Sequence, residues 1–530
     1  MKKFIVLSSV LLLILAFGAT VYGQEQKLDF RASGFIDAQS LLWRGVTGGN
    51  KTAGIINAYA SAYQPPVSTA GDAWNRTAHY MESRARLKFD AVMGKELSGT
   101  IFFEMDSGSN GATGSGWGDV KPGAINNISD RNSFGYWSMD RAAVEIKNIY
   151  FDVALPYIGI PIPMQVRVGG QPLSIRPNLF VYTDGMGIKG GIKIDPVNIE
   201  PFWFKALQGK LWADQGNDVY GVHANAKVSG FTLGGYFVYY NLNTYPFSVS
   251  TTANIGGVPV TNAGSAVIAG TLSADFWWLG FYADGKAGPV NVNFDFIYDN
   301  GKVKSRIFDD LTIDYDGWVV YGKVDYPWEK FNLGAVAYYA SGADANKTSA
   351  SGLPGTKVAN PGAPVGTYST KVKSYVTPPG SEAATNFGES VVFYTTWITR
   401  GDTGIAQTTN YDQVSKGPVG GTWMAKLYGS YKATPWFKVT LQGLYIGDTT
   451  KHGDTFGASR DAGGDLANHG TIGWESDLIT ELQIYKNLKF SVGLGAMAPG
   501  GAFKFYNTAT KENEKPHFPW QLCTNIVYNF

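Results

Sequence analysis

Cysteine and charged residues are both scarce in this chain of 530 residues. Cys523 is the only cysteine, and Asp, Glu, Lys and Arg make up 16% of the sequence, against roughly 25% in an average soluble protein. A single cysteine excludes an intrachain disulfide and a haem-attachment motif, which needs two cysteines. The formal net charge of +1 gives no indication of a nucleic-acid partner.

Long hydrophobic runs are missing except at the N-terminus. Lys2 and Lys3 precede an apolar stretch that continues to Phe17, and small residues follow up to Gly23. This order is typical of a cleaved signal peptide, because the run is shorter than the roughly 20 residues of a spanning helix. We therefore expect residues 1–23 to be a signal peptide and residues 24–530 to form one mature domain.

Motifs of enzymes and metal sites are missing as well. GxSxG, a phosphate-binding GK[ST] loop and HExxH do not occur, and the five histidines have no ligand-like spacing. The sequence therefore predicts a protein without enzymatic activity and without a cofactor.

Glycine and aromatic residues are abundant instead, and apolar residues alternate with polar ones in many short segments. There are 66 glycines, and aromatic residues make up 14% of the chain. Alternation with a period of two is the pattern of β-strands, and several segments approach the 9–11 residues of a tilted strand that crosses a bilayer. The eighteen predicted strands are 28–39, 81–91, 97–106, 141–155, 163–171, 187–195, 197–208, 219–229, 231–242, 273–287, 290–299, 315–325, 330–341, 421–432, 436–448, 472–486, 487–498 and 519–530.

The connections between these segments alternate between short and long. Tight turns rich in Gly, Pro and Asn follow every second strand, and long polar connections follow the others, the longest at about 342–419. Outer-membrane barrels have this organisation, with short periplasmic turns and long extracellular loops. We therefore predict an all-β fold, a transmembrane antiparallel barrel of about eighteen strands, with sixteen as the alternative and residues 342–419 as a long extracellular loop.

The last strand keeps its alternation to the final residue. The apolar set is Trp520, Leu522, Ile526, Tyr528 and Phe530, and polar residues alternate with it. In a closed barrel the last strand pairs with the first, so we expect these five residues to face lipid. A terminal aromatic residue on such a strand resembles the signal by which the bacterial outer-membrane assembly machinery recognises barrel proteins.

Charged residues gather on one face of the segment 81–91. This face carries Glu82, Arg84, Arg86, Lys88 and Asp90, and charge on a lipid face costs about 2–4 kcal/mol per Arg or Lys at the midplane. In a barrel the row must therefore line the lumen, where it attracts anions; the alternative is a solvated face of a soluble sheet. Neighbouring strands add Glu104 and Arg167, and a slip in the alternation near Lys147 predicts a bulge.

Tryptophan residues gather near the ends of the predicted strands, which is typical of interfacial girdles. This set is Trp43, Trp203, Trp277, Trp278, Trp318, Trp328, Trp423, Trp436, Trp474 and Trp520.

Part of the sequence resembles a known family. RARLKFDAVMGKELSGTIFFEM (84–105), AAVEIKNIYFDVALP (142–156) and MQVRVGGQPLSIRPNLFVYTDGMG (164–187) resemble the opening strands of outer-membrane homotrimeric porins of sulfate-reducing bacteria. The resemblance implies a trimeric diffusion porin. By analogy with general trimeric porins, the connection 171–184 folds into the lumen and puts Arg176 and Asp184 at the constriction; the alternative is a loop that covers a trimer interface.

These patterns together predict a porin in the outer membrane of a Gram-negative-type bacterium. We expect a water-filled, weakly anion-preferring channel for small hydrophilic solutes, in contact with lipid and lipopolysaccharide. A channel specific for sugars or organic acids is the nearest alternative. A barrel sheath for an electron-transfer cytochrome and a barrel lipase or protease are the others, and the enzyme would need a nucleophile and a histidine at the rim.

Overall fold

The structure is a computed structural model that describes part of the chain. The described residues are 27–44, 77–106, 143–155, 162–206, 216–243, 245, 253–255, 258–260, 272–306, 312–344, 371–394, 398, 405–406, 414–455, 459, 461–462, 467–507, 512–514 and 518–530. The predicted signal peptide, residues 1–23, lies outside them.

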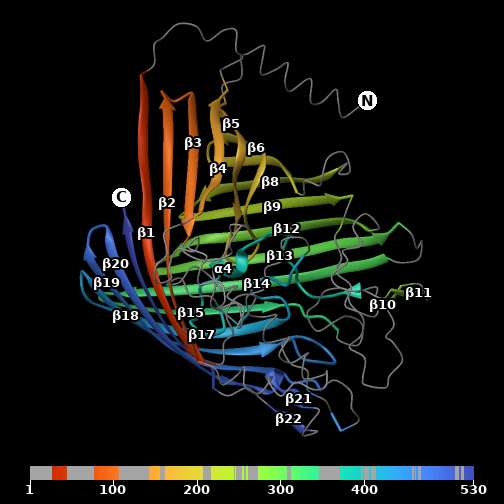
Figure 1. Ribbon diagram of the computed structural model, residues 1–530. Helices are drawn as coiled ribbons and strands as arrows, with labels where there is room; N and C mark the ends of the chain where they lie inside the picture. Colours follow the sequence, from red (N-terminus) through yellow and green to blue (C-terminus); the bar gives the residue numbers. More distant parts are fainter. Residues whose placement is uncertain are drawn as a thin grey trace, which may run out of the picture.

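Eighteen antiparallel strands form a closed β-barrel (Figure 1). Each strand pairs with the next around the wall, and the last strand pairs with the first from Phe35↔Asn529 to Arg44↔Trp520. The strands of the wall are β1 (Leu28–Arg44), β2 (Thr77–Met93), β3 (Leu97–Asp106), β4 (Ala143–Ala154), β5 (Met164–Ile175), β6 (Val181–Ile194), β7 (Val197–Lys205), β8 (Asn217–Val228), β9 (Phe231–Leu242), β12 (Leu272–Ala287), β13 (Val290–Ser305), β14 (Thr312–Trp328), β15 (Phe331–Ala340), β17 (Thr422–Thr434), β18 (Phe437–Asp448), β19 (Thr471–Tyr485), β20 (Leu488–Pro499) and β23 (Trp520–Asn529).

Short elements lie in the connections. β10 (Ala253–Ile255) pairs with β11 (Val258–Val260), β21 (Phe505–Asn507) pairs with β22 (Glu512–Glu514), and β16 (Lys371–Val372) pairs in parallel with β14. The helical elements are α4 (Ala383–Asn386) and the 3-10 turn η2 (Gly501–Phe503). Among the described residues, no helix has the length and apolar character needed to cross a membrane.

The strand prediction is confirmed. Every predicted segment overlaps one strand of the wall, and the count is eighteen rather than sixteen. The bulge predicted near Lys147 is present, because the pairing of β3 with β4 shifts between Phe102 and Phe103. Period-two alternation therefore located the strands, because each strand has one face toward lipid or solvent and one toward the interior.

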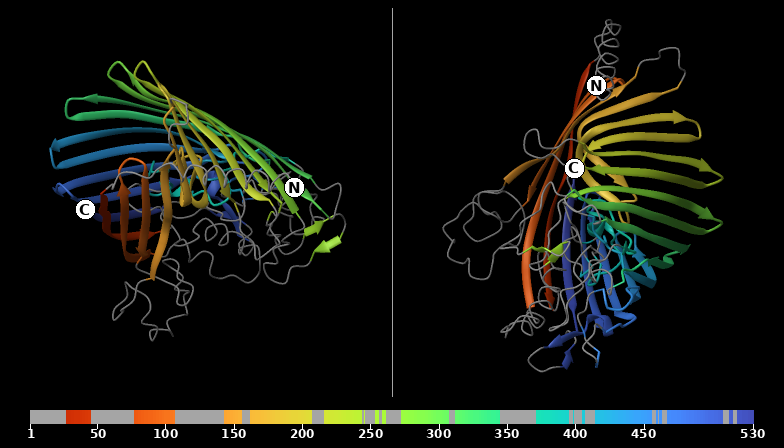
Figure 2. Two further views of the ribbon diagram at one scale, coloured as in Figure 1. Left: turned by 90° about the horizontal axis from the view of Figure 1, so that it is seen from above. Right: turned by 90° about the vertical axis from the view of Figure 1, so that its right-hand side faces the viewer.

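Tight turns join alternate strands along one rim of the barrel (Figure 2). Between β8 and β9 the turn residues Ser229 and Gly230 have φ of 49° and 86°. Two consecutive positive φ values are the geometry of the type I′ turn, whose twist matches that of the flanking strands. We call this rim, which also holds the β2–β3 and β19–β20 turns, the short-turn end.

The outward face of the wall is apolar and carries two rows of aromatic rings. Near the opposite rim, which we call the long-loop end, ring centroids lie 5.3 Å apart in the pair Trp318–Tyr339 and 4.6 Å apart in Tyr445–Trp474. Near the short-turn end, Phe331 packs against Trp328 and Tyr431. Exposed aliphatic side chains lie between the rows, such as Leu427 and Leu441 at 71% and 64% exposure.

Two of the predicted girdle tryptophans do not belong to these rows. Trp43 and Trp278 are 5% and 0% exposed, and each lies on the inward face of its strand. For these two residues the girdle prediction is wrong, because the interior of this barrel is itself packed with protein.

Candidate functional site: the barrel interior

The interior of the barrel contains part of its own chain, residues 371–394 and 398, which we call the internal segment. At its start the backbone of Val376 is fixed by two wall residues: its carbonyl accepts from Trp278 Nε1 of β12 at 2.8 Å, and its N–H donates to Asp299 of β13 at 3.1 Å. Asp299 is 0% exposed and also accepts from Gly317 N of β14. In Figure 1, α4 of this segment lies within the ring of strands.

The middle of the internal segment binds two carboxylates of β19. Glu475 accepts backbone N–H groups from Val391, Val392 and Phe393 at 3.0, 2.6 and 2.9 Å, and Asp477 accepts from Val391 at 3.2 Å. Both carboxylates are buried. Successive N–H groups that converge on one carboxylate neutralise much of the cost of burying it.

Further contacts continue around the wall. Glu389 forms a buried ion pair with Lys426 of β17, and accepts from Tyr321 of β14 at 3.0 Å. At the end of the segment, Asn525 of β23 donates to the carbonyl of Ile398 at 2.7 Å.

One segment therefore touches inward-facing residues of β12, β13, β14, β17, β19 and β23. In a closed barrel only the lumen gives access to all of these strands at once. Residues 342–419 were predicted as a long extracellular loop. The structure instead places the described residues 371–394 and 398 inside the barrel, because buried acids, amides and aromatic rings of the wall provide partners for their backbone.

The tip of the β5–β6 hairpin also folds into the lumen. Arg176 donates to Asp284 of β12 at 2.6 Å and to Asp295 of β13 at 2.5 Å, and its guanidinium lies 4.6 Å from the ring centroid of Tyr282. Next to it, Phe180 is fully buried and stacks on Tyr236 of β9 with ring centroids 4.8 Å apart. The tip is thus held by charge and by aromatic packing on the wall facing it.

This hairpin differs in detail from the predicted loop 171–184. β5 continues to Ile175 and β6 begins at Val181, so only residues 176–180 form the turn. The two strands lose their outer partners near the middle, because β4 pairs with β5 only as far as Gly170 and β6 pairs with β7 only from Gly187. Beyond these points the hairpin leaves the wall.

The hairpin and the internal segment are bonded to each other. Tyr375 donates its hydroxyl to the carbonyl of Leu179 at 2.9 Å, and Ser381 donates to the carbonyl of Phe180 at 2.7 Å. Glu382 N donates to the carbonyl of Tyr182 at 2.7 Å. The two elements therefore form one body within the lumen.

The predicted charged row of β2 lies on the inward face and is paired with acids. Arg84 Nη2 lies 3.4 Å from Glu104 Oε1, and Arg86 forms an ion pair with the same carboxylate. Lys88 Nζ lies 3.0 Å from Asp90 Oδ2. The side chain of the remaining member, Glu82, lies outside the described part of the chain. The positive charge by which this row is expected to attract anions is thus largely compensated at close range.

The other predicted pore residues are paired too. Arg167 Nε lies 2.7 Å from Asp152 Oδ1 across the β4–β5 pair. Asp184 of the hairpin lies 2.9 Å from Lys147 Nζ and accepts from Asn148 at 2.7 Å, both on β4. Asp184 keeps 32% side-chain exposure, so this cluster reaches water.

Glu382 adds a carboxyl group to that cluster. Its backbone is bonded to Tyr182, two residues before Asp184. Burial raises the pKa of Glu382 above its usual value, and the positive charges of Lys147 and Arg86 oppose this shift. The cluster between the β5–β6 hairpin, the internal segment and strands β2–β4 therefore combines the acids Glu104, Asp184 and Glu382 with bases of β2 and β4.

The five predicted assembly residues share one face of β23. Trp520, Leu522, Ile526, Tyr528 and Phe530 alternate with inward-facing residues, of which Gln521 and Cys523 are both 0% exposed. Their role in assembly stays a prediction.

A serine, a histidine and an aspartate meet at the long-loop end. His469 Nδ1 lies 2.8 Å from Asp454 Oδ2 and 3.4 Å from Ser459 Oγ. A catalytic triad needs the serine on Nε2, opposite the aspartate. Here both contacts use the same ring nitrogen, so the three residues are arranged as a loop-stabilising cluster.

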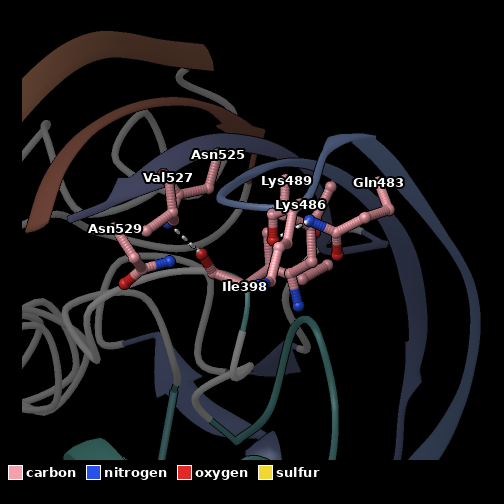
Figure 3. Close-up of a pocket in the computed structure, with 8 residues that line it drawn as sticks. Ile398, Gln483, Lys486, Lys489, Asn525, Val527 and Asn529 are labelled. Atoms are coloured by element: carbon pink, nitrogen blue, oxygen red, sulfur yellow. Dashed lines mark hydrogen bonds between the residues drawn. The ribbon is translucent and has the colours of Figure 1, made fainter. Parts of the chain in front are cut away.

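Two cavities lie beneath the internal segment, toward the short-turn end. One, of about 370 Å³, is lined by Ile398, Gln483, Lys486, Lys489, Ser491, Asn525, Val527 and Asn529 (Figure 3). The other, of about 300 Å³, is lined by Lys323, Asp325, Asn332, Gly388, Glu389, Lys426, Tyr428, Ser430, Lys438, Thr440, Gln442, Ile479, Glu481 and Lys489. They share Lys489.

Sequence reasoning missed the anchors Glu475, Asp477 and Asp299, and it missed Glu382. A signal was present for the first two: they alternate within an apolar strand, so they had to face inward. Nothing in the sequence indicates their partners, which lie more than 80 residues away.

Comparison with protein-family models gives no match, and no curated protein matches the chain. The resemblance to homotrimeric porins of sulfate-reducing bacteria therefore stays a prediction. Among solved structures, OccK1 (OpdK) of Pseudomonas aeruginosa is similar with a TM-score of 0.46 and 7% identity, covering 94% of this chain and 98% of that one. A BenF-like porin from Pseudomonas fluorescens Pf-5 has a TM-score of 0.44 and 9% identity, covering 95% and 98%.

Proposed function

We propose that this protein is an outer-membrane channel of a Gram-negative-type bacterium, through which small hydrophilic solutes and ions diffuse passively. The observation that carries the proposal is the pair of aromatic rows on the outward face. Trp318 and Trp328 lie ten positions apart on β14, which is about 33 Å at roughly 3.3 Å per residue. A strand tilt of about 40° reduces this to about 25 Å, the height of the apolar band of outer-membrane barrels.

The interior supports a narrowed passage rather than an open one. The β5–β6 hairpin and the internal segment together occupy the lumen on the side of β9 to β23. Charged residues of β2, β3 and β4 border the remaining side. A channel of this kind selects solutes by size. The cavities beneath the internal segment favour the second candidate function, which is a channel for a particular class of solute.

We also propose a weak preference for anions, with a different origin from the β2 row. The two cavities at the short-turn end are lined by five lysines and three carboxylates, an excess of two positive charges. Charges on low-dielectric walls raise the local concentration of counter-ions.

The remaining alternatives require changes in this interior. A cytochrome threaded through the barrel would have to displace the internal segment from Glu475, Lys426 and Asn525. An acyl-transfer enzyme at the rim would need Ser459 to move to the other nitrogen of His469.

Assembly partners are part of the proposal. Recognition of the last strand by the assembly machinery is supported by its regular pairing with β1 up to Asn529, and contact with lipid and lipopolysaccharide by the apolar outer face. The homotrimer rests on the family resemblance alone, and cross-linking of the protein in outer-membrane vesicles tests it.

Swelling of liposomes that contain the purified protein tests the channel function. We expect swelling with small sugars and a rate that falls steeply as the sugar becomes larger. Liposomes that respond no faster than protein-free ones would contradict the proposal.

A further inference from the structure

The cavity of about 370 Å³ is lined by residues of three wall strands, β19, β20 and β23, by the β19–β20 turn and by Ile398 at the end of the internal segment. Figure 3 shows Asn525, Val527 and Asn529 of β23 on one side, Gln483, Lys486 and Lys489 on the other, and Ile398 between them. Its volume falls within the roughly 300–1,000 Å³ of small-molecule sites.

The lining of this cavity combines positive charge with neutral hydrogen-bonding groups. Lys486 and Lys489 supply ammonium groups, Gln483, Asn525 and Asn529 supply amides, and none of the described residues that line it is acidic. The nearest carboxylate in contact with them is Glu481, which lies 3.2 Å from Lys489 and 2.8 Å from Lys438. One carboxylate is thus shared by two lysines, and in the described part of the chain Lys486 has no carboxylate partner.

Two polar side chains hold the frame of this cavity. Gln483 Nε2 donates to the carbonyl of Tyr485 at 2.7 Å and to that of Lys486 at 3.3 Å, which fixes the turn that carries Lys486. On the other side, Asn525 holds Ile398 at 2.7 Å. The lysines therefore project from a defined frame, and binding an anion there requires little reordering of the backbone.

We propose that this cavity binds a small soluble anion with carboxylate or phosphate groups, held by Lys486 and Lys489. This inference deepens the proposed channel function, because it names the class of solute and the place where the solute pauses. We take a soluble anion rather than a lipid phosphate as the ligand, because the strand residues Ser491 and Asn525 of the lining lie on the inward faces of β20 and β23.

Calorimetric titration of the full chain in detergent tests the site without requiring conductance. Succinate and inorganic phosphate serve as probes, and succinamide as the neutral control. We expect saturable binding of at least one anion and none of succinamide. The double variant K486Q/K489Q should weaken binding by at least about tenfold, equivalent to about 1.4 kcal/mol. The matched control is K227Q. Lys227 is exposed, lies on β8 at the short-turn end of the barrel and lines neither cavity.

Two further variants keep the test decisive if the double variant folds poorly. K486Q alone changes an exposed turn residue and should weaken binding, whereas K489R should keep it. Absence of anion binding to the wild type, or equal binding by K486Q and K227Q, would overturn the site. Binding without conductance in bilayers would instead overturn the channel function and leave the site standing.

Discussion

Arg176 Nη1 lies 2.6 Å from Asp284 Oδ2, although 108 positions separate the two residues along the chain. The contact joins the tip of the β5–β6 hairpin to the wall it faces, and a second aspartate, Asp295, is 1% exposed beneath the same guanidinium. The hairpin that folds into the lumen is thus held at its tip by two aspartates of the wall.

The variant R176Q should release this tip. It leaves Asp295 buried without its cation, and removal of one partner of a buried ion pair costs about 3–5 kcal/mol. We expect a lower unfolding temperature, measured by heat-modifiable mobility, and a larger, noisier single-channel conductance. R167Q is the matched control, because it removes an Arg–Asp pair between adjacent strands of the wall. Equal effects of the two variants would contradict a role of Arg176 in positioning the hairpin.

The variant R84Q/R86Q/K88Q should move the reversal potential in a salt gradient toward cation preference. It leaves Glu104 and Asp90 with less compensation, and the three positions lie about 6–7 Å apart along one strand. This spacing is below the Debye length of about 10 Å at 0.1 M salt, so the shift should be largest at low salt and fade toward 1 M. An unchanged reversal potential at low salt would show that ions do not pass this wall.

Acidification should increase the anion preference through Glu382. Burial raises the pKa of its carboxyl, so Glu382 takes up a proton at a higher pH than an exposed glutamate, whose pKa is about 4.3. Folding also favours the neutral form of Glu382. Glu382 therefore contributes to stability in acid, and this contribution is lost as the pH rises through the raised pKa. Reversal potentials measured from pH 8 to pH 5 should shift toward anions in the wild type.

The variant E382Q should show the acidic value already at pH 8 and a smaller dependence on pH. E329Q, in the β14–β15 turn, removes the same charge outside the lumen and should behave as the wild type. If E382Q and the wild type give the same pH profile, Glu382 does not border the conducting passage.

Deletion of Phe530 should impair insertion while leaving export across the inner membrane intact. Phe530 exchanges two backbone hydrogen bonds with Gly34 at 3.0 and 3.1 Å, so its loss removes the last rung of barrel closure as well as the terminal aromatic group. Fractionation and heat-modifiable mobility measure the outcome. A folded barrel in the outer membrane at normal level would argue against the assembly role.

Strand positions and strand faces could be predicted from the sequence because each depends on local alternation. Trp520 and Gln521 already show which face of β23 is apolar, and the slip at Lys147 already shows the bulge. The interior could not be predicted, because its contacts join distant positions. The loop-like residues 371–394 gave no period, and the partners of Glu475 depend on where the chain returns inside the barrel.

The charged row of β2 shows the same limit. Its inward direction follows from the cost of charge in lipid, but its net effect depends on Glu104 of the next strand, which faces Arg86 across the ladder. Similarly, Asn525 faces inward as expected, yet it is only 7% exposed and its amide is bonded to Ile398 of the internal segment, a partner that the sequence does not indicate.

Single-channel conductance in planar bilayers, compared between the wild type and E475A, is the most direct test of a channel narrowed by its own chain. E475A leaves the backbone N–H groups of Val392 and Phe393 without their acceptor, at about 1–3 kcal/mol each, and Val391 keeps only its bond to Asp477. We expect discrete, ohmic conductance steps for the wild type and larger, fluctuating steps for E475A. Absence of steps from folded wild-type protein, or identical steps from both proteins, would contradict a channel narrowed by its own chain.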